Sequence, residues 1–423
     1  MDVVETFGKT VDRQCDRDPA KGRRVLRAGW EAQLFRFRHM PVKALMPAYQ
    51  YLAALMMDTM LKPLRDPGHS AVVSIFTPSQ LLQEVGLSPY NAEAYSAYLL
   101  GSRCEHSCIL TAEAAGLPET LCSYHKIFTG AAEKGLLPRP RCIVYTNLTC
   151  DANMLTFKRM ERFFNVPAFF IDVPWTQTEA DVRAVASQLR DLGRFLEDIT
   201  GNKTDEKRLM SRIRRSIDTM DTFRQARRLQ KDKYIPTDLV SPQYGAMVNN
   251  VLLGTPEVEK FARMLLKDVK LAGPARGKRI YWVHTNPYWS DAMHKALYIN
   301  ESAQIIGSDM EQVVYPEEMA AQDPYEAMAR QMVFNHLNGS VERRIQAAIQ
   351  QAKETGCDGA VWFNHWGCKH TLGGSALAKK RFQEAGIPCL VLDGDGVDRA
   401  HGGEGQTATR LGAFIEMLED RNE

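Results

Sequence analysis

Two strand-like runs joined by one helix constrain the fold of this chain more than any other feature. Cys142–Thr146 (CIVYT) and Ala168–Val173 (AFFIDV) are short apolar runs rich in β-branched and aromatic residues, and Asn153–Phe164 between them has the composition of a helix. Two strands connected through a helix lie parallel in one sheet. The sequence therefore predicts an α/β unit with a parallel sheet.

The same texture recurs along the rest of the chain. Further strands are expected at Ala71–Phe76, Arg279–Val283, Ala303–Ile306, Gly359–Phe363 and Pro388–Leu392, and helices at Ser340–Thr355, Ser375–Ala385 and Gly405–Leu418. We predict an α/β protein with two Rossmann-like parallel-sheet domains. The expected segments are a helical N-terminal segment (1–65), a first α/β domain (66–175), a helical connector (176–278) and a second α/β domain (279–423).

The connector has its own start and stop signals. Thr176 and Glu179 have the spacing of a capping box, and Gly201 is a suitable residue to end the helix that follows. The residues after Gly201 are highly charged and mostly helical in character, so we expect no sheet in this segment.

Composition excludes several classes of partner. The 423 residues leave room for two or three domains, and the net charge of +2 comes from interspersed acidic and basic residues. This balance gives no reason to expect nucleic-acid binding. The N-terminus lacks the regions of a secretory signal, and the longest apolar runs, such as Tyr51–Met57, are too short to cross a bilayer. We therefore expect a cytoplasmic protein without a membrane partner.

Three predicted strands end in polar loops that could carry a site. Cys142–Thr146 leads to Cys150, Gly359–Phe363 leads to Cys368, and Arg279–Val283 leads to His284. Open α/β sheets bind ligands at the carboxyl ends of their strands. These loops are therefore the first place to look for chemistry.

The nine cysteines separate into classes by their surroundings. Three of them, Cys142, Cys357 and Cys389, lie within or beside apolar strands and are expected to pack in the core. Cys104 and Cys108 are four residues apart, share one helical face and are also expected to pack. Cys15 has no expected role. Cys122, Cys150 and Cys368 instead lie in polar turns, where exposure favours the thiolate. Spacing alone leaves open whether they bind iron, because there is no CxxC pair or compact ferredoxin motif.

The segments around these three cysteines resemble those of the 2-hydroxyacyl-CoA dehydratase family, which also contains the ATP-dependent benzoyl-CoA reductases. The similarity extends from about Ser74 to Leu418. It rests on Glu119 and Leu121-Cys122-Ser123-Tyr124, on Thr146-Asn147 with Cys150-Asp151 and Val166-Pro167, on Cys357-Asp358-Gly359 with Gly367-Cys368-Lys369, and on Asp393-Gly394-Asp395 with Thr409-Arg410.

The resemblance implies a specific site and reaction. Cys122, Cys150 and Cys368 would hold one [4Fe–4S] cluster between the two domains and leave the fourth iron open. A separate ATP-dependent iron–sulfur activator would supply one electron, and a 2-hydroxyacyl-CoA substrate would lose water through a ketyl radical. Family members pair, so a homodimer or a heterodimer with a related subunit is expected. The chain has no Walker A motif, in keeping with ATP chemistry in another protein.

Other polar residues near the motifs are candidates for further roles. His365 is the candidate acid–base catalyst. His125, His284 and Asn286 are candidates for contact with the substrate. Ser123, Asn147 and Lys369 are candidates to tune the cluster.

The sequence also departs from the family. Asn364-His365-Trp366 precedes Gly367-Cys368, where dehydratase subunits tend to have Arg-Ser before the cysteine. Alternatives therefore stay open: a benzoyl-CoA-type reductase subunit, a double-cubane reductase, a non-catalytic electron-relay partner, or a two-domain binding protein without a cluster. Cys142 is the one cysteine between the first two motifs, which favours a single cubane.

Overall fold

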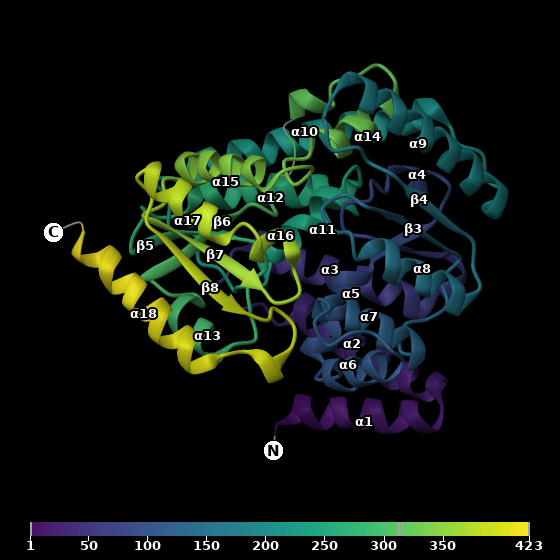
Figure 1. The fold of residues 1–423 in the computed structure, drawn as a ribbon, viewed down its shortest axis with the longest axis horizontal. Coiled ribbons are helices and arrows are strands. Elements are labelled where there is room, and N and C mark those ends of the chain that lie inside the picture. Colours follow the sequence, from purple (N-terminus) through teal and green to yellow (C-terminus); the bar gives the residue numbers. More distant parts are fainter. Residues whose placement is uncertain (1, 312–313, 315, 422–423) are drawn as a thin grey trace.

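Two four-stranded parallel sheets form the framework of the protein (Figure 1). The computed structural model describes residues 2–311, 314 and 316–421. The first sheet has the order β2-β1-β3-β4 and the second β6-β5-β7-β8, and all their strand pairs are parallel. The predicted fold class, with two Rossmann-like parallel-sheet domains, is confirmed.

The strands agree closely with the predicted runs. Their bounds are β1 Ser70–Val73, β2 Ser88–Asn91, β3 Cys142–Thr146, β4 Ala168–Ile171, β5 Lys278–Val283, β6 Ala303–Ser308, β7 Gly359–His365 and β8 Cys389–Gly394. Seven of the eight strands were expected from buried runs, because a parallel strand covered on both faces must be apolar throughout. The sequence did not predict β2 (SPYN), whose Pro89 and flanking polar residues hide a strand that pairs with β1 in register.

The helices surround and connect these sheets (Figure 1). Their bounds are α1 Val3–Arg17, α2 Pro19–His39, α3 Pro47–Arg65, α4 Gln80–Glu84, α5 Ala92–Gly101, α6 Glu105–Ala114, α7 Ser123–Glu133, α8 Asn153–Phe164, α9 Glu179–Thr200, α10 Glu206–Gln230, α11 Tyr244–Asn250, α12 Pro256–Leu271, α13 Asp291–Leu297, α14 Pro324–Val333, α15 Val341–Thr355, α16 Lys369–Leu372, α17 Ser375–Glu384 and α18 Glu404–Asp420.

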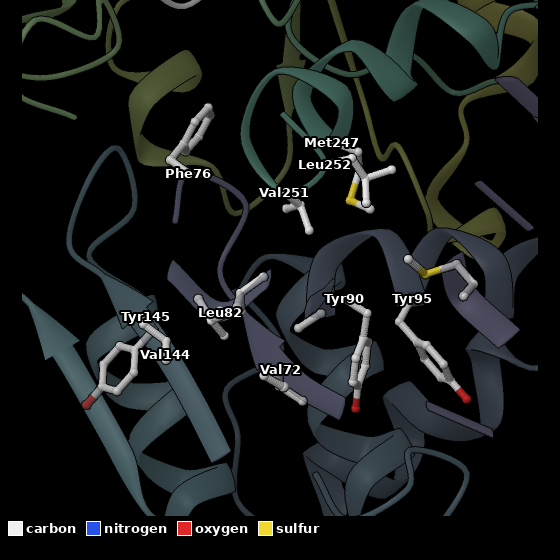
Figure 2. Close-up of a cluster of buried hydrophobic side chains, with 14 of the residues drawn as sticks. Val72, Phe76, Leu82, Tyr90, Tyr95, Val144, Tyr145, Met247, Val251 and Leu252 are labelled. Carbon is white, nitrogen blue, oxygen red and sulfur yellow. The ribbon is translucent and has the colours of Figure 1, made fainter. Parts of the chain in front are cut away.

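One continuous core joins the N-terminal helices, the first sheet and the connector. It includes Leu26 of α2, Val144 of β3 and Val251 after α11, each fully buried. Figure 2 shows Val251 and Leu252 of the connector on the same side as Met247, facing residues of the first sheet. The predicted division into four segments stays a prediction. The first sheet lies within 66–175, and the second begins at Lys278, one residue before the predicted boundary.

The second sheet has its own apolar layer on each face. Trp282, Val361 and Phe363 pack against α13 and α18, whereas Tyr281 and Trp362 pack against α15 and α17. Neighbouring residues of one strand thus face opposite layers, as strand geometry requires.

The start of α9 corrects one prediction. The capping box is formed by Thr178 and Asp181, and Thr176 instead donates its hydroxyl hydrogen to the Asp181 carboxylate. The helix begins at Glu179 with Thr178 as its N-cap, so Asp181 and not Glu179 occupies the N3 position, and its carboxylate accepts from the Thr178 backbone N–H at 2.8 Å. The predicted stop at Gly201 is confirmed, with a left-handed φ of 76°. Among the described residues, no helix combines the length and apolar character that crossing a membrane requires.

Candidate functional site

A cavity of about 1540 Å³ lies between the two sheets and brings three cysteines together. Cys122, Cys150 and Cys368 all line it, and they are the cysteines that do so among the residues that the structure describes. Cys122 immediately precedes α7, Cys150 lies in the loop after β3, and Cys368 immediately precedes α16 in the loop after β7. The two carboxyl edges of the sheets therefore face the same space, as open parallel sheets predict.

Gly367 brings the second domain against the first at this point. Its φ is +79°, and a Cβ added there would lie 2.4 Å from the backbone nitrogen of Cys122. Only glycine combines this backbone conformation with so close an approach. The absence of a side chain at Gly367 thus lets Cys368 lie beside Cys122.

Cys122 and His365 make a buried contact across the two domains. His365 Nε2 lies 3.1 Å from Cys122 Sγ, and the backbone N–H of Gly396 donates to His365 Nδ1 at 3.0 Å. A ring nitrogen that accepts a hydrogen bond carries no hydrogen, so neutral His365 has its hydrogen on Nε2, directed at sulfur. Burial also lowers the pKa of His365.

This geometry places His365 differently from the sequence prediction. The residue ends β7, where a loop was expected after Phe363, because its backbone continues the pairing with β8. Both ring nitrogens are engaged by protein atoms, and the acid–base role of His365 stays a prediction.

Cys150 has a histidine of its own from the first domain. His125 Nε2 lies 3.4 Å from Cys150 Sγ, and Nδ1 lies 2.8 Å from Thr156 Oγ1. Thr156 Oγ1 donates its hydrogen to the Ala152 carbonyl, so it accepts from Nδ1–H. Burial lowers the pKa of His125 to about 3. This histidine is therefore neutral and faces the sulfur with a lone pair.

The expected exposure of the three cysteine turns is wrong for Cys122, which is buried, whereas Cys150 and Cys368 are partly exposed. Burial, with the neighbouring thiols Cys368 and Cys150, raises the pKa of the Cys122 thiol well above its ordinary value. Burial and Cys368 raise the pKa of Cys150 to about 12. The Cys122 turn is polar in sequence, but the loop at Gly367 of the second domain packs against it. A metal that binds these sulfurs would have to displace their protons.

The remaining predicted residues lie near the cavity with their side chains engaged by the protein. Ser123 donates to Asp395 at 2.5 Å and does not line the cavity. Asn147 ties the ends of β3 and β4 together through Asp172 and Val173. Asn286 donates to Leu239 O and accepts from Gln243, and Lys369 is exposed and paired with Asp151.

His284 is the predicted residue whose ring is most available to a ligand. It lines the cavity after β5, and its ring centroid lies 6.1 Å from that of His365. Its Nε2 has no hydrogen-bond partner among the described residues, whereas its Nδ1 lies 3.3 Å from Arg344. Burial and the charge of Arg344 lower its pKa well below the ordinary value.

Sequence reasoning missed Glu93, which lies in the first turn of α5, directly after the unpredicted strand β2, and lines the cavity. Its carboxylate accepts from Asn91 Nδ2 at 2.6 Å and from Ile75 N at 3.4 Å. Burial raises the pKa of Glu93 to about 7. A carboxyl group with this pKa can both give and take a proton near neutral pH. Recognising β2 as a strand would have placed Glu93 at a carboxyl edge beside the cysteine loops.

Comparison with known proteins gives the family. The family described as "2-hydroxyglutaryl-CoA dehydratase, D-component" matches residues 74–418. The chain belongs to this family. The helices α1, α2 and α3 precede the matched segment.

Curated relatives of this D-component family member are dehydratase subunits. The (R)-phenyllactyl-CoA dehydratase alpha subunit of Clostridium sporogenes is 23% identical over 82% of this chain and 88% of its own length. The (R)-2-hydroxyisocaproyl-CoA dehydratase alpha subunit of Clostridioides difficile is 22% identical over 82% and 89%. The beta subunit of the first enzyme is 25% identical over 85% and 94%. These matches confirm the predicted family and support a lyase of the 2-hydroxyacyl-CoA dehydratase type.

The three cysteines supply a donor set that iron–sulfur clusters take, namely thiolates. Within the described part of the chain, no three His, Cys, Asp or Glu side chains converge as ligands of one metal ion must. In a cubane each thiolate binds a different iron, so its sulfurs stand farther apart. Cys122, Cys150 and Cys368 supply three thiols from separate loops at one cavity.

Proposed function

We propose that this chain is the iron–sulfur subunit of a 2-hydroxyacyl-CoA dehydratase, with a [4Fe–4S] cluster held by Cys122, Cys150 and Cys368. The observation that carries the proposal is the meeting of these three thiols, from loops far apart in sequence, at one large cavity. The names of the relatives support a CoA thioester as the substrate class. When bound, the cluster would supply a single low-potential electron and a Lewis-acidic iron.

Glu93 is our candidate for the proton transfers of the elimination. Loss of water from a 2-hydroxyacyl thioester needs one proton delivered to the leaving hydroxyl and one removed from the β-carbon. Glu93 would give its proton to the hydroxyl and, as carboxylate, take the β-proton, which restores its starting state. Its pKa of about 7 suits both steps.

The histidines of the site would hold sulfur and substrate in place. His365 would donate from Nε2 to the Cys122 sulfur, since its Nδ1 accepts from Gly396. His284 would contact an oxygen atom of the substrate, since its Nε2 is free of protein partners among the described residues. Such positioning groups orient reacting atoms and tune the electron density on ligands.

The packing of the other cysteines favours one cubane over two. Cys104 and Cys108 are fully buried between α6 and its neighbours, and burial raises the pKa of both thiols well above the ordinary range. Neither lines the cavity. We therefore favour a single cluster, with a partner subunit and an ATP-dependent activator as the other components of the proposed enzyme.

Iron and acid-labile sulfide per chain, measured after anaerobic purification, test the cluster. We expect about four of each in the wild type, loss of most iron in Cys150→Ala, and no loss in Cys389→Ala. Cys389 is a matched control because it is a cysteine of the second sheet that begins β8, at the end of the strand opposite to the carboxyl edge. Equal iron in the two variants, or about eight iron per chain, would contradict the assignment.

Turnover of Glu93→Gln tests the proton transfers. The amide keeps the shape of the side chain and loses its acid–base chemistry, so turnover of a 2-hydroxyacyl-CoA should fall by about 10²–10⁴-fold. Iron content should stay at the wild-type value. A variant with normal iron and normal turnover would remove Glu93 from the mechanism.

A further inference from the structure

A buried ion pair lies behind the carboxyl edge of the second sheet. Arg344 of α15 donates from Nε to Asp309 Oδ2 at 2.7 Å, and the two side chains are only 3% and 0% exposed. Asp309 directly follows β6, next to His284 after β5. A buried pair of this kind is weak evidence for stability alone, because desolvation offsets its attraction.

The guanidinium of Arg344 reaches two histidines besides Asp309. Its Nη1 lies 2.8 Å from His370 Nδ1, and its Nη2 lies 3.3 Å from His284 Nδ1. Arginine has only donors, so both Nδ1 atoms must accept. A neutral imidazole that accepts at Nδ1 has its hydrogen on Nε2. The planar fork of Arg344 thus determines which nitrogen of each ring is the donor.

Asp309 also holds the backbone of His284. The His284 N–H donates to Asp309 Oδ1 at 2.8 Å, while the other carboxylate oxygen accepts from Arg344. His284 has a φ of +80°, in the left-handed region that residues with a Cβ rarely adopt. Such conformations persist where the surroundings over-determine them and cluster at functional sites. One carboxylate therefore controls both the backbone of His284 and the arginine that orders its ring.

His284 Nε2 is the ring nitrogen that neither Arg344 nor Asp309 contacts. His284 lines the cavity that the three cysteines share, and Nε2 has no hydrogen-bond partner among the described residues. Burial and the adjacent cation keep the ring neutral by lowering its pKa. The neutral Nε2–H tautomer offers the cavity one hydrogen-bond donor and no lone pair.

We infer that Arg344 and Asp309 form a positioning unit that locks His284 as the Nε2–H tautomer, so that His284 donates a hydrogen bond to an oxygen atom of the substrate and cannot act as a base. Identification of the ligand as a substrate rests on the proposed function, whereas the tautomer does not. A preorganised donor suits a reaction in which negative charge develops on a thioester oxygen.

Nitrogen NMR of the full-length chain, labelled with ¹⁵N-histidine and purified anaerobically, tests the tautomer directly. The His284 signals are assigned as those absent from His284→Gln. We expect a neutral ring with hydrogen on Nε2 and an accepting Nδ1. Hydrogen on Nδ1, or a charged ring at neutral pH, would overturn the inference whether or not the chain proves to be a dehydratase.

Arg344→Lys asks whether the arginine fork is what fixes the ring. Lysine keeps the positive charge for Asp309 but cannot reach both acceptors, so the His284 signals should show a mixture of tautomers. Arg343→Lys is the matched control, because its neighbour Arg343 on α15 instead donates to the Asn338 carbonyl. An unchanged His284 spectrum in Arg344→Lys would overturn the role of Arg344. If this variant does not fold, the wild-type spectrum still decides the tautomer.

Kinetics with a 2-hydroxyacyl-CoA separate positioning from general support. Arg344→Lys should lower kcat by about 10–100-fold, with a smaller effect on KM. His284→Gln keeps an N–H donor that needs no tautomer control. In that background Arg344→Lys should have little further effect, because the two residues act through one hydrogen bond. Multiplying effects in the double variant would show that Arg344 acts independently of His284.

Discussion

The loops that carry Cys150 and Cys368 share a left-handed backbone conformation but differ in what packs against it. Each cysteine follows a residue in the left-handed region: Thr149 has a φ of 66° and Gly367 a φ of 79°. At Gly367 any side chain would meet the backbone of Cys122, whereas the structure tolerates a threonine at 149. The first loop meets the other domain through the exposed side chains of Asp151 and Lys369, whereas the backbone of the second loop packs directly against the backbone of Cys122. The comparison shows that close contact between the two backbones, and not the turn itself, requires glycine.

Gly367→Ala tests this comparison and should have the largest effect on iron content. A Cβ costs about 1–2 kcal/mol in the left-handed region, and here it must also push Cys122 away from Cys368. We expect most iron to be lost, as measured per chain after reconstitution. Gly386→Ala is the control, because Gly386 has the same φ of +79° and open space around it. Similar iron contents in the two variants would show that the close approach is unimportant.

His365→Phe should change the cluster without removing it. Phenylalanine keeps a ring against Tyr124, whose ring centroid lies 5.3 Å from that of His365, but it removes the donor to Cys122. Hydrogen bonds to cluster sulfurs favour the reduced state, so the reduction potential should fall. A potentiometric titration measures this change, with His401→Phe on an exposed histidine as the control. An unaltered potential at full iron content would show that His365 does not donate to the sulfur.

Glu93 should give the first domain a pH-dependent stability. Its pKa is about 7 in the folded chain, above the ordinary value of 4.5, so the folded state holds a proton that the unfolded chain has released. The contribution is present below the unfolded pKa and is lost as pH rises through 7. Between about pH 5.5 and about pH 8, the free energy of unfolding should fall more for the wild type than for Glu93→Gln. Urea unfolding measures this difference.

The control for that measurement is Glu416→Gln, which alters an exposed glutamate on α18. It should keep the pH dependence of the wild type. Parallel curves for the wild type and Glu93→Gln would contradict a proton on Glu93 at neutral pH.

Thr149→Gly should have the smallest effect and sharpen the comparison. Glycine relieves the left-handed strain at this position but increases the freedom of the unfolded chain, so the free energy of unfolding should change by less than about 1 kcal/mol. Iron content should stay at the wild-type value, as measured per chain. A large loss of iron would show that the Thr149 side chain, and not only its backbone, supports Cys150.

Local sequence accounts for much of the fold. The bounds of β3 and α8 agree with their predicted ranges, because apolar runs of strand length and a helix between them admit few other arrangements. The strand β2 was missed because Ser88, Pro89 and Asn91 oppose a strand locally, and only pairing with β1 makes them one. Its loss from the prediction also hid Glu93, which depends on that strand for its place in the cavity.

By itself the sequence determined the two parallel sheets, the family, and the choice of three cysteines that the structure brings to one cavity, since these follow from local runs and ordered motifs. Only the tertiary structure decided the state of each side chain. Cys122 proved buried because the second domain packs against it at Gly367, and His365 proved doubly bonded because it meets Cys122 of the first domain and Gly396 of its own. Arg344 reaches His284 within the second domain, across 60 residues of chain. Burial and partners depend on which distant segments meet, and no local pattern records that meeting.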